Sequence, residues 1–284
     1  MDDANQVSDT DPPAYRSTEQ YARRAKSFGS AASQYAQHRP DYALEAVRWV
    51  LAPVASGAGQ RRPIDVLDLG AGTGKLTGQL AGLRLAGGPL AVIAVEPDQD
   101  MLAELRRQLP GVTAIEGKAE EIPLPDASVD AVLAGQAAHW FDLDRAIPEM
   151  ARVLRPGGVL GGLWNADDNR VGWVASLHEA SGRRTVVPIG GDERDDEGMT
   201  GWLDQAGQGL FKRAEEEEFP NSQTRTADSL VATLSTHSAF LIMEPGEREQ
   251  ALGRVRTFLA KTPETACGEF QLPMTTLAIR AIRL

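Results

Sequence analysis

One segment constrains the possible folds of this chain more than any other: an apolar run that leads into three alternating glycines. It spans residues 64–77 and reads IDVLDLGAGTGKLT. The apolar run predicts a buried strand over Ile64 to Leu69, and Lys75 to Leu85 predicts a helix. Glycines between them allow a sharp turn and close approach of a ligand, because they lack a Cβ atom. We therefore expect the first unit of an open α/β sheet that is doubly wound and mostly parallel.

The spacing of the loop indicates which ligand it binds. Dinucleotide-binding loops favour Gly-x-Gly-x-x-Gly, whereas this loop reads Asp68-x-Gly70-x-Gly72-x-Gly74. This form resembles motif I of the class I methyltransferases that depend on S-adenosylmethionine (SAM). The resemblance implies that Asp68, Gly70, Gly72 and Gly74 bind SAM. A tight turn with a purely structural role is the alternative for a glycine loop taken by itself.

Composition excludes several classes of partner. The chain has 284 residues, a hydrophobic fraction of 42% and a net charge of −11. Such an acidic protein does not favour nucleic acid or an anionic membrane surface. The single Cys267 fits a reducing compartment, and no apolar run approaches the roughly 20 residues of a membrane span. Because the N-terminus also lacks the features of a signal peptide, we expect a soluble cytoplasmic protein.

The N-terminal region predicts a tail followed by two helices. Residues 1–19 are polar and predict a disordered tail, and residues 20–54 predict a helical lid that is interrupted before Pro40. The lid resembles that of the methyltransferase type 11 domain proteins in the trans-aconitate methyltransferase-like branch. There it closes over the methionine end of the cofactor, which implies cofactor contacts for Tyr35 and Arg39. Amphipathic packing with a solvent-facing Arg39 is the alternative.

The second predicted strand, Leu90 to Val95, ends in an acidic residue at an informative distance. Glu96 lies 22 residues after Gly74, close to the spacing of about 20 at which an acid binds a ribose in such folds. A carboxylate accepts hydrogen bonds from both ribose hydroxyls and disfavours the 2′-phosphate of NADP. The alternative is a charge that only complements a helix dipole. Pro97 and Met101 are then expected to flank the adenine.

The third predicted strand, Val112 to Glu116, leads into a loop that resembles the adenine loop of the family. The resemblance implies that the backbone N–H near Ala119 meets the purine edge, with Glu120 beside it.

The fourth predicted strand, Asp130 to Gly135, runs into Gln136-Ala137-Ala138-His139-Trp140-Phe141. Strands one and four flank the topological switch point of a doubly wound sheet, where ligands bind. We therefore expect Gln136 at the cofactor and Trp140 and Phe141 at the substrate. His139 is either a base or hydrogen-bonding group for the substrate, or a residue that positions the loop. With four His and one Cys, no metal-binding set is visible.

The rest of the chain predicts completion of a seven-stranded sheet. We expect a helix over Asp144 to Leu154, with Pro148 near its first turn. A fifth strand over Val159 to Trp164 follows it and completes the SAM-binding core at 60–165. Residues 166–210 predict a helical cap over the substrate pocket, which we expect to involve Trp164 and Trp173. Residues 211–284 predict an exposed acidic strand at 215–218, helices at 227–240 and 246–260, and a last, antiparallel strand to Arg283.

The resemblance, which covers about residues 28–165, implies the reaction. It implies direct transfer of a methyl group from SAM to a small-molecule acceptor, which leaves S-adenosylhomocysteine. We expect the acceptor atom to be the oxygen of a carboxylate or a hydroxyl, and only a hydroxyl needs a base. The alternatives are a catalytically silent SAM-binding module and an NAD-dependent oxidoreductase, which the glycine spacing disfavours. The oligomeric state is not predicted.

Overall fold

The structure is a computed structural model that describes residues 40–55, 62–85, 88–182, 203–204, 207–235, 240 and 243–284. The predicted tail at 1–19 lies outside the described residues. So does the greater part of the predicted lid, including Tyr35 and Arg39. These assignments stay predictions.

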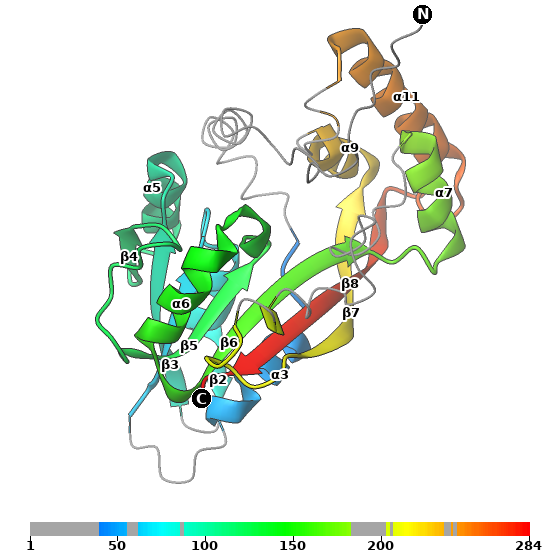
Figure 1. Cartoon of the computed structure of the whole chain (residues 1–284). Helices are drawn as coiled ribbons and strands as arrows, with labels where there is room; N and C mark the ends of the chain where they lie inside the picture. The colour runs from blue at the N-terminus through cyan, green and yellow to red at the C-terminus, as the bar shows by residue number, and fades with distance from the viewer. Residues whose placement is uncertain are drawn as a thin grey trace, which may run out of the picture.

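The described residues form one mixed sheet (Figure 1), and the strand before the glycine loop lies inside it, next to the central strand β5 (Val129–Gly135). β1 (Ile64–Leu69) lies between two strands and pairs in parallel with each of them. These are β3 (Gly88–Glu96) and β5 (Val129–Gly135). β4 (Thr113–Glu116) and β6 (Leu154–Asp167) extend the parallel part outward. The predicted doubly wound α/β fold is therefore confirmed.

The far side of the sheet contains the predicted antiparallel strand. β8 (Glu269–Ile282) pairs antiparallel with both β6 and the edge strand β7 (Glu215–Thr226). The four acidic residues at the start of β7 are exposed, as predicted. A short β2 (Arg84–Leu85) adds an eighth strand by pairing antiparallel with the start of β3. The predicted helix over Lys75 to Leu85 was therefore too long at its C-terminal end.

Three helices cover one face of the sheet. α3 (Leu44–Ala55) and α4 (Lys75–Gly82) pack on β1, β5 and β6 through a shared apolar cluster. α5 (Gln99–Gln108) packs beside them through Leu105, which contacts Ala94 and Ala71. α4 begins directly after the glycine loop, so packing of this helix fixes the end of the loop.

α6 (Leu143–Val153) covers the other face. Pro148, which was expected near the first turn, is the sixth residue of this helix. Its side chain is exposed, and it is flanked by the buried residues Ile147 and Met150. Tertiary packing of an apolar helix face usually contributes more than local propensity, which explains why α6 continues through the proline.

A separate apolar cluster joins three helices at the far end of β7 and β8 (Figure 1). α7 (Gly172–Ser181) follows β6, while α9 (Ala227–Ser235) and α11 (Pro245–Lys261) lie between β7 and β8. The helices expected at 227–240 and 246–260 are thus present, the first of them shorter than expected. They pack with α7, which comes from the region expected to form the cap, so one helical cluster draws on two distant parts of the chain. No helix of the described residues is both long and apolar enough to cross a membrane.

Ion pairs and hydrogen bonds between arginine and aspartate side chains connect the amino ends of the central strands. The Asp130 carboxylate accepts hydrogen bonds from the Arg62 guanidinium at 2.6 and 2.7 Å and from the Asp65 N–H at 2.9 Å. Arg155 lies 3.0 Å from the same carboxylate. Burial acts to raise the pKa of Asp130, but the hydrogen bonds and the arginine charges hold it below its ordinary value. This cluster closes the amino edge of the sheet, and the opposite edge carries the loops described next.

Candidate functional site

Two loops meet at the carboxyl edge of the sheet, between β1 and β5. A Cβ atom added to Gly70 would come within 2.8 Å of the Ala137 Cβ and 3.2 Å of the Phe141 ring. The N–H groups of Gly70 and Ala71 donate to the Val95 carbonyl at 2.8 and 3.1 Å. The loops after β1, β3 and β5 therefore converge at the switch point of the sheet, where ligands bind in this class of fold.

The three glycines of the first loop have three different surroundings. All have positive φ: 69° at Gly70, 57° at Gly72 and 91° at Gly74. A Cβ atom on Gly74 would lie 2.9 Å from the Leu105 Cγ, whereas one on Gly72 would meet only the Met101 sulfur, at 3.8 Å. Gly74 thus permits close packing of α5, and the cofactor contact expected for it stays a prediction. Gly72 is the glycine that leaves room for a ligand.

Asp68 is a buried acid at the base of this loop. Its Oδ2 accepts a hydrogen bond from the Thr77 hydroxyl at 2.5 Å, while its buried Oδ1 has no hydrogen-bond partner. Burial raises the pKa of Asp68 to about 7, and the nearby charge of Glu96 acts in the same direction against the Thr77 hydrogen bonds. Because a buried acid of this kind is stabilised by a cation, Asp68 suits a positively charged ligand group.

Glu96 ends β3 and holds the glycine loop from the neighbouring strand. Its Oε2 accepts from the Gly72 N–H at 2.8 Å, and its Oε1 accepts from the Asp98 N–H at 2.9 Å. Burial raises the pKa of Glu96 against these two hydrogen bonds, and the Asp98 charge adds to the increase. A carboxylate oxygen has two lone pairs, so each oxygen retains acceptor capacity for a ribose hydroxyl.

The residues expected around the adenine lie on the adjacent segments. Met101 is half-buried on α5, close to Gly72, and Pro97 is exposed directly before this helix. Ala119 is buried. The Glu120 carboxylate accepts from the Asp142 N–H at 2.9 Å, so it joins the loop after β4 to the loop after β5. These positions agree with one continuous cofactor edge, and the individual contacts stay predictions.

The loop after β5 begins with a strained residue. Gln136 has a φ of 54°, which is unusual for a residue other than glycine. Its N–H donates to the Leu163 carbonyl at 2.8 Å, and its side-chain amide donates to the Asn165 carbonyl at 3.0 Å. Both bonds go to β6, so this strand holds Gln136 in its conformation.

His139, Trp140 and Phe141, further along this loop, differ in exposure. His139 lies in a short 3-10 helix (Ala138–Trp140) and is exposed, with its ring 5.0 Å from that of Trp140. Trp140 is half-buried, and Phe141 packs over Gly70. His139 is thus accessible to an acceptor, whereas Phe141 contacts the cofactor loop.

The structure corrects the expected role of Trp164 and places Trp173 among the distal helices, where its substrate contact stays a prediction. Trp164 is 2% exposed and belongs to the core beneath α6, so it has no surface to offer a substrate. It follows Leu163, which packs under α3, and strand alternation turns it to the opposite face. Trp173 lies on α7 with its ring edge-on to Phe270 at 5.9 Å. It packs against the apolar cluster of the three distal helices.

Sequence reasoning missed a polar cluster at the same edge. Asn165, near the end of β6, bonds to the Asp41 carbonyl and to the Thr276 hydroxyl of β8, and Asn221 of β7 joins them. The rule that ligands bind at the carboxyl ends of parallel strands would have singled out Asn165. No local signal identifies Thr276 or Asn221, which come from distant strands.

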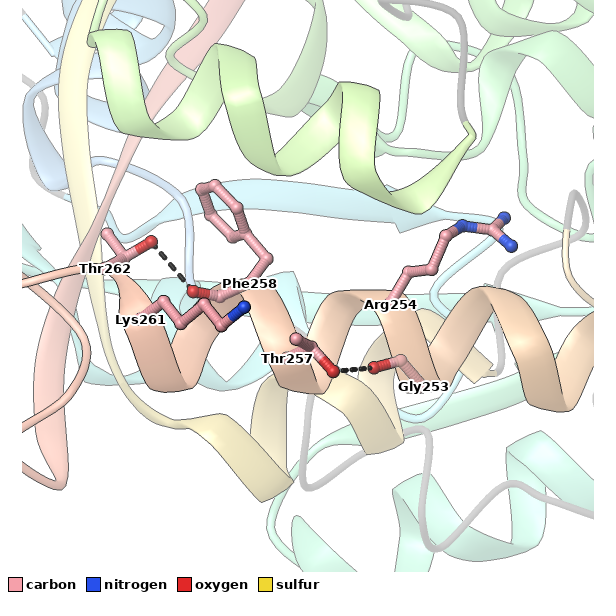
Figure 2. A pocket seen from close by; sticks show the side chains of 6 residues that line it. All are labelled: Gly253, Arg254, Thr257, Phe258, Lys261 and Thr262. Atoms are coloured by element: carbon pink, nitrogen blue, oxygen red, sulfur yellow. Dashed lines mark hydrogen bonds between the residues drawn. The ribbon is translucent and has the colours of Figure 1, made fainter.

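A large, open hollow lies elsewhere, along α11 (Figure 2). Its volume is about 790 Å³, and it is lined by Arg254, Phe258, Lys261 and three neighbours. The Thr257 and Thr262 hydroxyls in it already donate to carbonyls of α11. This open surface is far less suited to catalysis than the loop edge, which has buried acids. Within the described ranges, no three His, Cys, Asp or Glu side chains are grouped to hold a metal ion.

Comparison with known proteins agrees with this geometry. Residues 67–161 match the family described as a methyltransferase domain. Uncharacterised methyltransferases of Mycobacterium tuberculosis and Mycobacterium bovis are 43% identical over 257 residues, which is 90% of this chain and 95% of theirs. A malonyl-(acyl-carrier protein) O-methyltransferase of Methylococcus capsulatus is 45% identical over 103 residues, covering 34% of this chain and 36% of its own.

A solved structure shows the same fold. A putative type II methyltransferase of Anaeromyxobacter dehalogenans superimposes with a TM-score of 0.54 at 27% identity, over 86% of this chain and 97% of that one. The resemblance to the trans-aconitate methyltransferase-like branch stays a prediction.

The different surroundings of Gly72 and Gly74 give a prediction about stability. Both substitutions to alanine place a side chain at positive φ, which costs about 1–2 kcal/mol. Gly74→Ala also drives a Cβ atom into Leu105, and such overpacking adds about 1–3 kcal/mol. We expect urea unfolding to show a clearly larger loss of stability for Gly74→Ala than for Gly72→Ala. Equal losses would contradict the packing role of Gly74.

Proposed function

Because the chain belongs to the class I SAM-dependent methyltransferases, we propose that it transfers the methyl group of SAM to an oxygen of a small-molecule acceptor. The oxygen is that of a carboxylate or a hydroxyl. The observation that carries the proposal is the pair of buried acids beside the open position at Gly72. Asp68 lies at the base of the loop and Glu96 bonds to its middle, so both act on the same ligand space.

The residues of this edge fit SAM by charge and by hydrogen bonding. SAM supplies a methyl group that the positive charge on its sulfur already activates. The unpartnered Oδ1 of Asp68 suits the ammonium group of the methionine part. The Glu96 oxygens suit the ribose hydroxyls. The chain therefore needs no nucleophile of its own, and its contribution is alignment of the acceptor and exclusion of water.

Two considerations favour an oxygen acceptor. The relative from Methylococcus capsulatus is named as an O-methyltransferase, although the similarity covers about a third of each chain. His139 is accessible at the loop after β5, where it can accept the proton of a hydroxyl. A carboxylate acceptor is already ionised and needs alignment alone.

The first test of the proposal is ligand specificity. We expect isothermal titration calorimetry to detect binding of S-adenosylhomocysteine and no binding of NAD, because the loop spacing and Glu96 suit the former. Gly72→Val should abolish the binding, since a branched side chain would fill the open space at Gly72, while circular dichroism should stay native-like. Comparable affinity for NAD would favour an oxidoreductase instead.

The raised pKa of Asp68 predicts a pH dependence of cofactor binding. A cationic ligand group favours the ionised carboxyl, and below a pKa of about 7 binding must first remove the proton. We expect the affinity for S-adenosylhomocysteine to fall about tenfold from pH 8 to pH 6. Asp68→Asn should bind more weakly at pH 8 and lose this dependence. The matched variant Asp126→Asn, at an exposed acid before β5, should keep it; an unchanged profile in Asp68→Asn would remove Asp68 from the ammonium contact.

The role of His139 separates an enzyme from a silent binder. We expect His139→Ala to bind S-adenosylhomocysteine within about threefold of the parent, under 1 kcal/mol. Methyl transfer to a hydroxyl acceptor, found by screening small carboxylates and phenols, should fall about tenfold or more. The parent's rate should fall at acidic pH, because a protonated imidazole cannot act as a base, and the variant should lack this fall. An undiminished rate would assign His139 to loop architecture, and no transfer across the screen would favour the silent module.

A further inference from the structure

The short segment before α3 is held from two sides at the cofactor edge. Residues 40–43 contact β6, β7 and β8 on one side. On the other side they contact α4, the helix that begins at the glycine loop. No other described segment connects the distal strands with the start of α4 through side-chain hydrogen bonds at this edge.

Thr276 is the centre of the contacts with the strands. It is fully buried on β8, directly opposite Asn165 of β6. Its hydroxyl donates to the Asn165 Oδ1 at 2.6 Å and accepts from the Ala43 N–H at 2.9 Å. It also accepts from the Asn221 amide at 3.2 Å. One hydroxyl thus uses its proton and both lone pairs.

The two asparagines hold the backbone two residues earlier, at Asp41. Asn165 donates to the Asp41 carbonyl at 3.1 Å, and Asn221 donates to the same oxygen at 2.8 Å. Asn221 also donates to the Asn165 Oδ1 at 3.2 Å. We call Asn165, Asn221 and Thr276 the strand clamp.

The opposite side of the segment is fastened to α4. The Gln79 amide donates to the Tyr42 carbonyl and accepts from the Tyr42 N–H, both at 2.9 Å. Lys75 pairs with Asp41 at 2.9 Å. The Tyr42 ring lies against Gly135, where an added Cβ atom would come within 2.6 Å of the tyrosine oxygen. Gly135 directly precedes Gln136, whose side chain bonds to the Asn165 backbone.

We propose that the strand clamp is a set of positioning residues for cofactor binding. By fixing residues 40–43, it holds α4 and the loop after β5 in the arrangement that accepts the cofactor. The inference rests on the proposed function, because it needs a ligand at the loop edge. According to this inference, three residues from distant strands affect the affinity for the cofactor, and they do so through residues 40–43.

A positioning role differs from simple stabilisation in what it changes. If the clamp is lost, the binding-competent arrangement becomes less populated, and the apparent dissociation constant rises by the inverse of that population. A hydrogen bond of equal burial elsewhere affects unfolding and leaves this population unchanged. The chain offers such a control in Thr265. This residue is buried between α11 and β8, and its hydroxyl donates to the Leu259 carbonyl at 2.6 Å.

The experiment compares two threonine-to-valine variants of the full chain by calorimetry with S-adenosylhomocysteine and by thermal unfolding. We expect Thr276→Val to weaken the ligand about fivefold or more, because valine keeps the shape and removes the hydroxyl. The affinity of Thr265→Val for the ligand should stay within about twofold of the parent's, even if its melting temperature falls as much as that of Thr276→Val. Thr276→Ser, which keeps the hydroxyl, should restore affinity to within about twofold.

Each outcome decides the proposal. Normal affinity in a folded Thr276→Val, or equal weakening in Thr265→Val, would overturn it. If Thr276→Val does not fold, Asn221→Ala on the half-buried edge strand replaces it, with an expected loss of about threefold or more and normal affinity as the overturning result. A parent that does not bind S-adenosylhomocysteine would instead overturn the proposed function, and this inference with it.

Discussion

The candidate site depends on one buried carboxylate that bonds to two backbone segments. Burial of Glu96 is costly for an ionised group, and the N–H groups of Gly72 and Asp98 offset that cost. The first bond fixes the loop after β1. The second fixes Asp98, whose own carboxylate caps α5 by accepting from the Asp100 and Met101 N–H groups. One side chain thus sets the loop, the start of α5 and the position of Met101 beside the open space at Gly72.

Sequence predicts this part of the molecule well because its determinants are local. Parallel strands buried on both faces appear as continuous apolar runs, and β1, β3 and β5 lie at or close to the expected residues, whereas β6 contains its expected residues but is longer at both ends. The acid that follows such a run must lie at the carboxyl edge of the sheet, which placed Glu96 beside the glycine loop. Asp68 and the loop after β5 follow from the same rule. Their contacts with a ligand stay predictions, because the fold positions these residues without showing what they bind.

The remaining features depend on contacts between distant residues. Alternation along a strand predicts that neighbouring side chains face opposite ways, but it does not say which face is open, so Trp164 was assigned to the pocket although it is core. The glycines at 72 and 74 look equivalent in sequence, and only the packing of Leu105 distinguishes them. Thr276 and Asn221 join Asn165 over separations of 111 and 56 residues. No hydrophobic periodicity or motif spacing in the sequence predicts these long-range contacts.

The local determinants and the contacts between distant strands lie largely in different parts of the chain, and this division bears on function. The match to the methyltransferase domain ends at residue 161, before Asn165, before the helical cluster of α7, α9 and α11, and before β7 and β8. Methyl transfer from SAM needs alignment more than it needs special groups, and the shared part contains the glycine loop, Asp68 and Glu96 that we propose for the cofactor. We expect residues beyond the shared part to contribute to selection of the acceptor, together with His139, Trp140 and Phe141 inside it. A relative that resembles the chain over about a third of its length therefore supports the chemistry of the proposal more strongly than the identity of its acceptor. The mycobacterial relatives match 90% of the chain, so their similarity extends well beyond the shared domain and they are the better guides to that identity.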